Sequence, residues 1–273
     1  SRGPRRGDAA LKPEIAAPGV AIVSAAAGSG NGARSLSGTS MAAPHVAGAL
    51  ALLRQLHPDW RAAELKALLM NSSSTLVSDG NQQVYAPGRI GAGRIDLAAA
   101  GAATAVAFDA DHPARVGISF GAPTVIDHYS AVRNVRIVNM APAPASYVAA
   151  YLPVTALPGV TVIAPATPIT VAAQGELAFP LHFHADASTM QDVRDPTVAA
   201  NQGATRAWLS EASGHLMLWP QGAALHATLV DADGAAQGVA ALTFDPATHT
   251  LEYHVTLTDR AAARATRVAV TVH

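Results

Sequence analysis

The chain has 273 residues, of which 50% are hydrophobic and only 14% are charged, and its formal net charge is −1. This length accommodates two domains of ordinary size. The near-neutral net charge gives no indication of a basic surface for nucleic acid. The sequence has no run of about 18 uncharged apolar residues, so no membrane span is expected. The sequence contains no cysteine, which excludes a disulfide framework and any thiolate metal site.

The first third of the chain predicts α/β structure. Residues 20–25 predict a short buried strand, and a loop of Gly, Ser and Asn over residues 28–38 leads to a helix from about Ser40 to Leu56. Pro44 is tolerated only in the first turn of a helix, which fits this beginning. The helix is apolar nearly all round, so we expect it to be enclosed on several sides.

Two further helices are expected before residue 105. Asp59 is the expected cap of a helix that runs to about Met70, and a last short helix is expected over residues 97–103. The helix that ends at Met70 has an apolar and a charged face, with Ala63, Leu65, Leu68 and Leu69 inward and Arg61, Glu64 and Lys66 outward.

From about Val106 the helical periodicity gives way to period-2 segments separated by Pro, Gly and Asp, which is typical of an antiparallel β domain. In the clearest strand, Pro180 suggests an edge or a bulge. One face of this strand carries Leu177, Phe179, Leu181 and Phe183, and the other carries Ala178, Pro180, His182 and His184. Further strands are expected at residues 133–139, 146–151, 160–163 and 169–173, and then at 227–230, 238–246 and 251–257.

One serine stands out chemically. Ser40 lies at the expected start of the apolar helix, within the sequence SGTSMAAPHVAG of residues 37–48. A serine hydroxyl becomes a nucleophile when a base takes its proton and donors hold the oxyanion that forms. The unpaired N–H groups of a helix N-terminus can supply such donors. For a bare Gly-Thr-Ser, the competing interpretation is an ordinary helix cap.

The longer run GTSMAAPHVAG resembles the nucleophile motif of the subtilisin-like serine proteases. Three other segments resemble parts of the same catalytic domain: SRGPR at residues 1–5, LKPEIAAPG at 11–19, with Glu14 where the family more often has Asp, and APGRIGAGRID at 86–96. The resemblance covers about residues 1–105 and implies part of an α/β domain with an incomplete parallel sheet. It implies that Ser40 is the nucleophile, with the Ser40 backbone N–H as oxyanion donor and Thr39 as a weaker support.

The other two members of a catalytic triad are not recognisable. In the subtilisin family the order along the chain is Asp, His, Ser, and none of the 11 histidines lies in a His-Gly-Thr context. His45, five residues after Ser40, would lie about 140° round the helix from Ser40 and roughly 7.5 Å along the axis. This geometry excludes His45 as the base for Ser40. We therefore expect a fragment of a serine endopeptidase that lacks the Asp and His and is inactive alone.

The resemblance also implies a domain order. Residues 1–105 would be the C-terminal portion of the catalytic domain, 106–221 a fibronectin-III-like β-sandwich, and 222–273 an incomplete β domain of the chordin type. The implied partners are a protein or peptide substrate and the missing N-terminal catalytic half, and the implied location is secreted or cell-surface.

Two alternatives remain open at this point. In one, the chain belongs to a pseudoprotease or scaffold whose β domains bind a surface or a partner protein. In the other, a separate chain brings the Asp and His to Ser40.

The residues themselves predict no cofactor and no metal. His182 and His184 share one strand face and could supply two ligands, but no third ligand is specified, so a solvated strand face is the favoured interpretation. The sequence Asp231-Ala-Asp233-Gly234 lacks the bidentate Glu of a calcium loop, so a β-turn is expected there. The resemblance allows a structural calcium ion in the parent protein, without any indication in this sequence.

Overall fold

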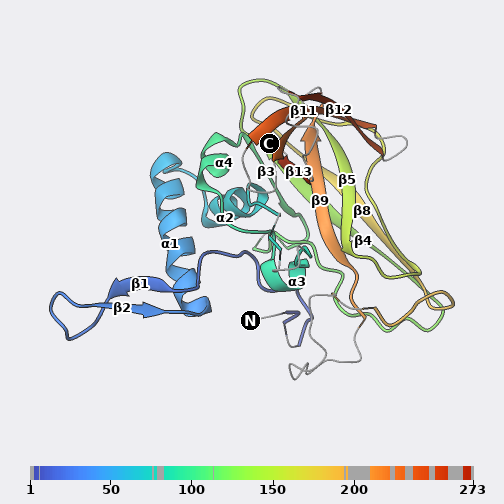
Figure 1. Ribbon diagram of the computed structural model, residues 1–273. Coiled ribbons are helices and arrows are strands. Elements are labelled where there is room, and N and C mark those ends of the chain that lie inside the picture. The colour runs from blue at the N-terminus through green and yellow to red at the C-terminus, as the bar shows by residue number, and fades with distance from the viewer. Residues whose placement is uncertain are drawn as a thin grey trace. The chain divides into compact units, whose positions relative to one another are not determined.

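The computed structural model of the protein (Figure 1) describes most of the chain. The described residues are 3–5, 7–75, 77–78, 83–112, 114–193, 195 and 210–221, and the backbone of strands at 225–230, 236–245, 250–257 and 267–271. The chain divides into two compact units, one of residues 1–145, 151–164 and 170–216 and the other of residues 146–150, 165–169 and 217–273.

The helices expected from the sequence are present. They are α1 (Thr39–Leu56), α2 (Ala62–Asn71) and α4 (Leu97–Ala102), and the structure adds a one-turn helix, α3 (Pro87–Ile90). A segment of four residues is too short to show helical periodicity, so the sequence does not predict α3. No described helix is both long and apolar enough to cross a membrane.

Two details of the helix starts correct the sequence-based predictions. Asp59 does not cap α2, because the N-cap is Arg61, whose backbone N–H donates to the Glu64 carboxylate at 2.7 Å. That contact is the reciprocal half of a capping box. Pro44 is the sixth residue of α1 and so lies beyond its first turn. Because proline has no N–H, the Ser40 carbonyl oxygen lacks its usual helical donor.

Helix α1 is largely exposed although its sequence is apolar. Only Ala49 and Leu53 are buried, with 2% and 1% of their surface exposed, and they face α2 and α4. Leu52 and Leu56 are 53% and 62% exposed. The described residues therefore do not provide the enclosure expected for such a helix.

The predicted buried strand near residue 20 is also corrected. Strands β1 (Ile22–Ala25) and β2 (Ala33–Leu36) pair only with each other in an antiparallel hairpin beside the start of α1 (Figure 1). Val23 is 68% exposed, because no other described strand or helix covers the hairpin. The loop expected at residues 28–38 thus contains a strand of its own.

The main core of the larger unit joins the helices to the first strand of the β region. Strand β3 (Ala105–Asp109) contributes Val106 and Phe108, which pack with Leu68 of α2. The buried members of this core are Ala49, Leu53, Leu65, Ala67, Leu68, Leu69, Met70, Ala100, Val106, Phe108 and Val116. Burial of this apolar surface stabilises the packing of α2 on α1 and on β3.

The β region forms three sheets. One has the order β3-β4-β8-β6, with β4 (His128–Asn139), β8 (Glu176–Asp186) and β6 (Val160–Ile163), and its strands pair antiparallel. The second has the order β7-β5-β9, with β7 (Ile169–Val171), β5 (Ala145–Thr155) and β9 (Ser213–Pro220). The third has the order β12-β11-β10-β13, with β12 (Thr250–Leu257), β11 (Ala236–Asp245), β10 (Leu225–Val230) and β13 (Arg267–Thr271).

The alternation expected for β8 is confirmed. Phe179 and Leu181 are buried on one face, while Pro180 and His184 are exposed on the other. Pro180 pairs with Asn134 of β4, but β6 pairs only with residues 182–185 of β8. Pro180 therefore lies where β8 has one described neighbour, in agreement with the predicted edge position.

The burial of α1 predicts opposite outcomes for two adjacent leucines. Replacing Leu53 by Ala should lower the free energy of unfolding by about 2–5 kcal/mol, because a buried side chain leaves a cavity. Replacing Leu52 by Ala should change it by less than about 1 kcal/mol, since most of that side chain is already in water. Urea denaturation measures both, and equal losses would contradict the one-sided packing of α1.

Candidate functional site

Ser40 is the second residue of α1 and is exposed. The N-cap residue Gly38 provides the carbonyl oxygen that accepts hydrogen bonds from Met41 N at 3.0 Å and Ala42 N at 3.3 Å. Neither the backbone N–H nor the hydroxyl of Ser40 has a hydrogen-bond partner among the described residues. Both groups are thus available at the positive end of the helix dipole.

The start of α1 is held by a close crossing of two backbone segments. Gly38 N donates to the Gly19 carbonyl oxygen at 2.7 Å, and Ala21 N donates to Ser37 Oγ at 2.9 Å. A Cβ atom added at Gly19 would lie 2.8 Å from the Gly38 carbonyl oxygen. Glycine at position 19 therefore lets the two segments approach closely enough to fix the turn before Ser40.

The segment that leads to Gly19 is paired with the segment after α3. Ala92 N donates to the Glu14 carbonyl oxygen at 2.9 Å, and Ala16 N donates to that of Gly93 at 2.8 Å. Ala16 and Arg94 form a parallel bridge. Gly91 has φ of 63°, and a Cβ there would lie 2.1 Å from the Glu14 carbonyl carbon, so this crossing also requires glycine.

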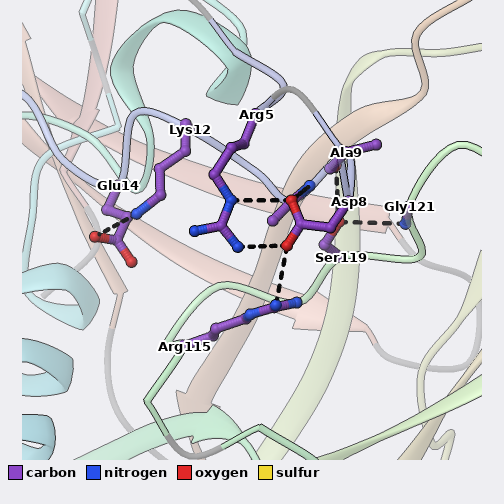
Figure 2. Close-up of polar contacts among 9 residues, drawn as sticks. Arg5, Asp8, Ala9, Lys12, Glu14, Arg115, Ser119 and Gly121 are labelled. Carbon is purple, nitrogen blue, oxygen red and sulfur yellow. Dashed lines mark hydrogen bonds and ion pairs between the residues drawn. The ribbon is translucent and has the colours of Figure 1, made fainter.

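Figure 2 shows how the chain before this segment is tied down by polar contacts. The Asp8 carboxylate lies between two guanidinium groups: it accepts from Arg5 Nε at 2.9 Å and from Arg115 at 3.0 Å. The hydrogen bond from Arg5 is the main reason that the pKa of Asp8 lies well below its usual range. Ser119 Oγ donates to the Ala9 carbonyl oxygen at 3.4 Å, so residues 115–121 hold the N-terminal segment from one side.

Glu14 is bound by two lysines. Lys12 Nζ lies 2.9 Å from its carboxylate, and Lys66 of α2 also donates to it. Burial acts to raise the pKa of Glu14, but the hydrogen bonds from Lys66 and Lys12 outweigh it, so the pKa is lowered. This ion pair links the segment that positions Gly19 to the core helix α2.

The other sequence-predicted site residues are placed as follows. Thr39 is the exposed first residue of α1, and its supporting role stays a prediction. His45 Nδ1 donates to the Met41 carbonyl oxygen at 2.9 Å, one turn back along the same helix. In the described part of the chain, no three His, Cys, Asp or Glu residues are grouped to hold a metal ion. The expected turn at residues 231–234 lies outside the described residues.

The sequence predicts Ser40 as the candidate nucleophile, which stays a prediction, but it does not predict the contacts that position this residue. The crossing of Gly19 with Gly38 and the contact of Glu14 with Lys66 join residues 19 and 52 positions apart, and no local pattern indicates such pairs. The one available signal was the Pro-Gly dipeptide at residues 18–19, which marks a turn.

Comparison with known proteins shows which family the first third of the chain resembles. Residues 1–93 match the subtilase family, peptidase S8. The chain is 54% identical over 69 residues to the subtilisin-like protease SBT3.11 of Arabidopsis thaliana, a match that covers 24% of this chain and 9% of that protein. It is 43% identical over 97 residues to the minor extracellular protease Vpr of Bacillus subtilis, with 34% of this chain and 12% of that protein covered.

A third relative gives the same picture: the subtilisin-like protease SBT3.5 of Arabidopsis thaliana is 43% identical over 93 residues, or 32% of this chain and 12% of that protein. The match thus spans about a tenth of the length of these relatives. A subtilase-family segment at residues 1–93 is therefore shown, and the residues that follow it have no counterpart in the family match.

The backbone crossings predict opposite effects of two glycine replacements. Gly91→Ala should destabilise the protein by about 2 kcal/mol or more, because the new methyl group meets the Glu14 backbone and φ is positive. Gly48→Ala should stabilise it by about 0.5–1 kcal/mol, because Gly48 lies within α1 and an added Cβ meets nothing within 4 Å. Thermal or urea unfolding measures both, and changes of the same sign would contradict the described packing.

The ion pairs of Glu14 predict a component of acid sensitivity. Because the pKa of Glu14 is lower in the folded than in the unfolded state, its carboxylate stabilises the fold above the unfolded pKa of about 4.3 and loses that effect as pH falls through the folded pKa. The difference in unfolding free energy between the wild type and Glu14→Gln should therefore shrink on acidification below about pH 4.3.

The matched control for this measurement is Asp59→Asn, which removes an exposed carboxylate from the turn before α2. A difference between wild type and Glu14→Gln that stays constant down to pH 3 would show that Glu14 does not contribute through its charge.

Proposed function

We propose that the subtilase segment at residues 1–93 carries the nucleophile of a subtilisin-like serine endopeptidase. The observation that carries the proposal is Ser40 itself: an exposed serine whose hydroxyl and backbone N–H have no hydrogen-bond partner among the described residues, at the start of a helix within the segment that matches the family. Serine peptidases use these two groups, one as nucleophile and one as oxyanion donor.

In the proposed reaction, Ser40 Oγ attacks the carbonyl carbon of the scissile peptide bond. The carbonyl oxygen becomes an oxyanion, to which the Ser40 backbone N–H donates a hydrogen bond, and Thr39 supports this turn of the chain. A histidine oriented by an aspartate takes the proton of the hydroxyl and gives it to the leaving amine. The substrate is a protein or peptide, which is hydrolysed by way of an acyl-enzyme on Ser40.

The histidine and aspartate are proposed to come from outside these 273 residues. Two observations support this: the Ser40 hydroxyl has no hydrogen-bond partner in the described part of the chain, and the one histidine on α1, His45, is bound to the Met41 carbonyl oxygen. Loss of the triad histidine in subtilisin lowers the rate by about 10⁶, so the chain alone is proposed to be inactive.

The open side of α1 also supports this proposal. Leu52 and Leu56 are exposed on the helix, and Val23 is exposed on the adjoining hairpin. Burial of each such side chain contributes about 1.5–3 kcal/mol, so these residues are suited to contact with the rest of a catalytic domain, including its parallel sheet and the missing N-terminal half.

The remaining residues are proposed to be accessory β domains. The antiparallel sheet β3-β4-β8-β6 and the sheet β7-β5-β9 support a fibronectin-III-like sandwich for residues 106–221, and residues 222–273 are proposed to be an incomplete domain of the chordin type. A secreted or cell-surface location is supported by the name of one relative, an extracellular protease. An inert scaffold is the weaker alternative, because residues 1–93, which include Ser40, match the subtilase family.

The test is labelling with a fluorophosphonate, read by peptide mapping for an adduct on Ser40. The chain as given should remain unlabelled, while the parent protein with the preceding coding region should label on Ser40 and hydrolyse casein. Ser40→Ala in that parent should lose both label and hydrolysis, and Ser35→Ala is the matched control for a nearby exposed hydroxyl.

Rapid labelling of Ser40 in the chain alone would show that one of its own histidines acts as the base. No labelling of Ser40 in a folded parent protein would contradict the proposed peptidase.

A further inference from the structure

The outer face of the sheet β3-β4-β8-β6 carries two histidines that the peptidase proposal does not use. His182 and His184 lie on the same face of β8, two residues apart. Their rings are parallel within 3°, and the ring centroids are 6.4 Å apart. Both side chains thus leave the sheet in the same direction, on the face opposite the buried Phe179 and Leu181.

The backbone under the pair is fixed on both sides. His182 and His184 lie in the part of β8 that pairs with β4 on one side and β6 on the other. A ligand pair on a doubly paired strand keeps its spacing, because hydrogen-bonded neighbours restrain the strand. Only the side-chain torsions need to change when both imidazoles turn to one ion.

A neighbouring hydroxyl orients one of the two rings. Ser130 of β4, directly across from His184, has its Oγ 2.8 Å from His184 Nδ1. When Nδ1–H donates to Ser130 Oγ, the lone pair of Nε2 is left free for a metal ion. Metal-binding histidines commonly have such a second contact, which sets the tautomer and the ring orientation.

No charged side chain is a direct cross-strand neighbour of the pair. These neighbours are Val132 and Ile163 beside His182, and Ser130 and Thr161 beside His184. On the same face, two residues further along β8, the Asp186 carboxylate accepts a hydrogen bond from Ser188 N at 2.9 Å and lies 3.7 Å from His128 Nδ1. The nearest arginine on this face in β4, Arg136, is in an ion pair with Glu176.

We propose that His182 and His184 form a solvent-exposed two-histidine site for a late first-row divalent metal ion, with Ser130 as a positioning residue. Imidazole nitrogen suits Cu²⁺, Ni²⁺ and Zn²⁺, and the Irving–Williams order places Cu²⁺ first among them. Water would complete the coordination, since no third His, Cys, Asp or Glu in the described part of the chain joins the pair. The proposed site does not involve Ser40. Because the sequence contains no cysteine, no thiolate competes with the histidines for Cu²⁺.

The test uses the full chain without an affinity tag, titrated with Cu²⁺ and followed by electron paramagnetic resonance. The wild type should bind one equivalent most tightly, with hyperfine structure from imidazole nitrogen. His182→Ala and His184→Ala should each weaken this binding at least about tenfold, because one imidazole no longer holds the ion for the other. Ser130→Ala should weaken it about tenfold while both ligands remain.

His45→Ala is the matched control, because His45 is also an exposed histidine but lies on α1. It should leave the tightest Cu²⁺ equivalent unchanged. Urea denaturation should give the same midpoint for all variants, since the replaced side chains are not buried. The proposal is overturned if the double variant His182→Ala, His184→Ala keeps the wild-type affinity and spectrum, or if His45→Ala lowers the affinity as much as His184→Ala does.

Discussion

The hydrogen bond from Gly38 N to the Gly19 carbonyl oxygen, 2.7 Å long, is the contact on which the geometry of Ser40 depends. It sets where α1 begins, and a side chain at position 19 would push the two segments apart. The support continues backwards from Gly19 through the pairing of residues 14–16 with 92–95 and through the ion pair of Glu14 with Lys66 of α2. The start of α1 is thus connected to the hydrophobic core by backbone hydrogen bonds and by the ion pair of Glu14 with Lys66.

Helix α1 has two very different sides. Its inner side is anchored by Ala49 and Leu53 in the core shared with α2, α4 and β3. The outer side presents leucines and small residues to solvent, together with the β1–β2 hairpin. A helix that is apolar all round is stable when other elements enclose it. This asymmetry fixes the inner side of α1 in the core and leaves its outer side accessible.

The local features of the fold were predictable from sequence, and the long-range ones were not. Period-2 alternation identified β8, and Pro180 indicated an edge position. An apolar run located α1, and an apolar face opposite a charged face located α2. The cap of α2 was misplaced at Asp59 because Arg61, a residue with no capping preference, is held by Glu64. The exposure of Val23 could not be predicted, since an apolar strand reads as buried whether or not a partner element is present. For the candidate site, the motif predicts Ser40, and this stays a prediction; the contacts of Gly19 and Lys66 that support its position could not be predicted, because these residues are distant from Ser40 in sequence.

The exposed leucines on the outer side of α1 can be probed with a hydrophobic dye such as ANS. The full chain should give strong dye fluorescence. Leu52→Lys combined with Leu56→Lys should reduce this fluorescence without lowering the urea midpoint. Absence of dye binding by the wild type, or a marked loss of stability in the lysine variant, would show that this side of α1 is already covered.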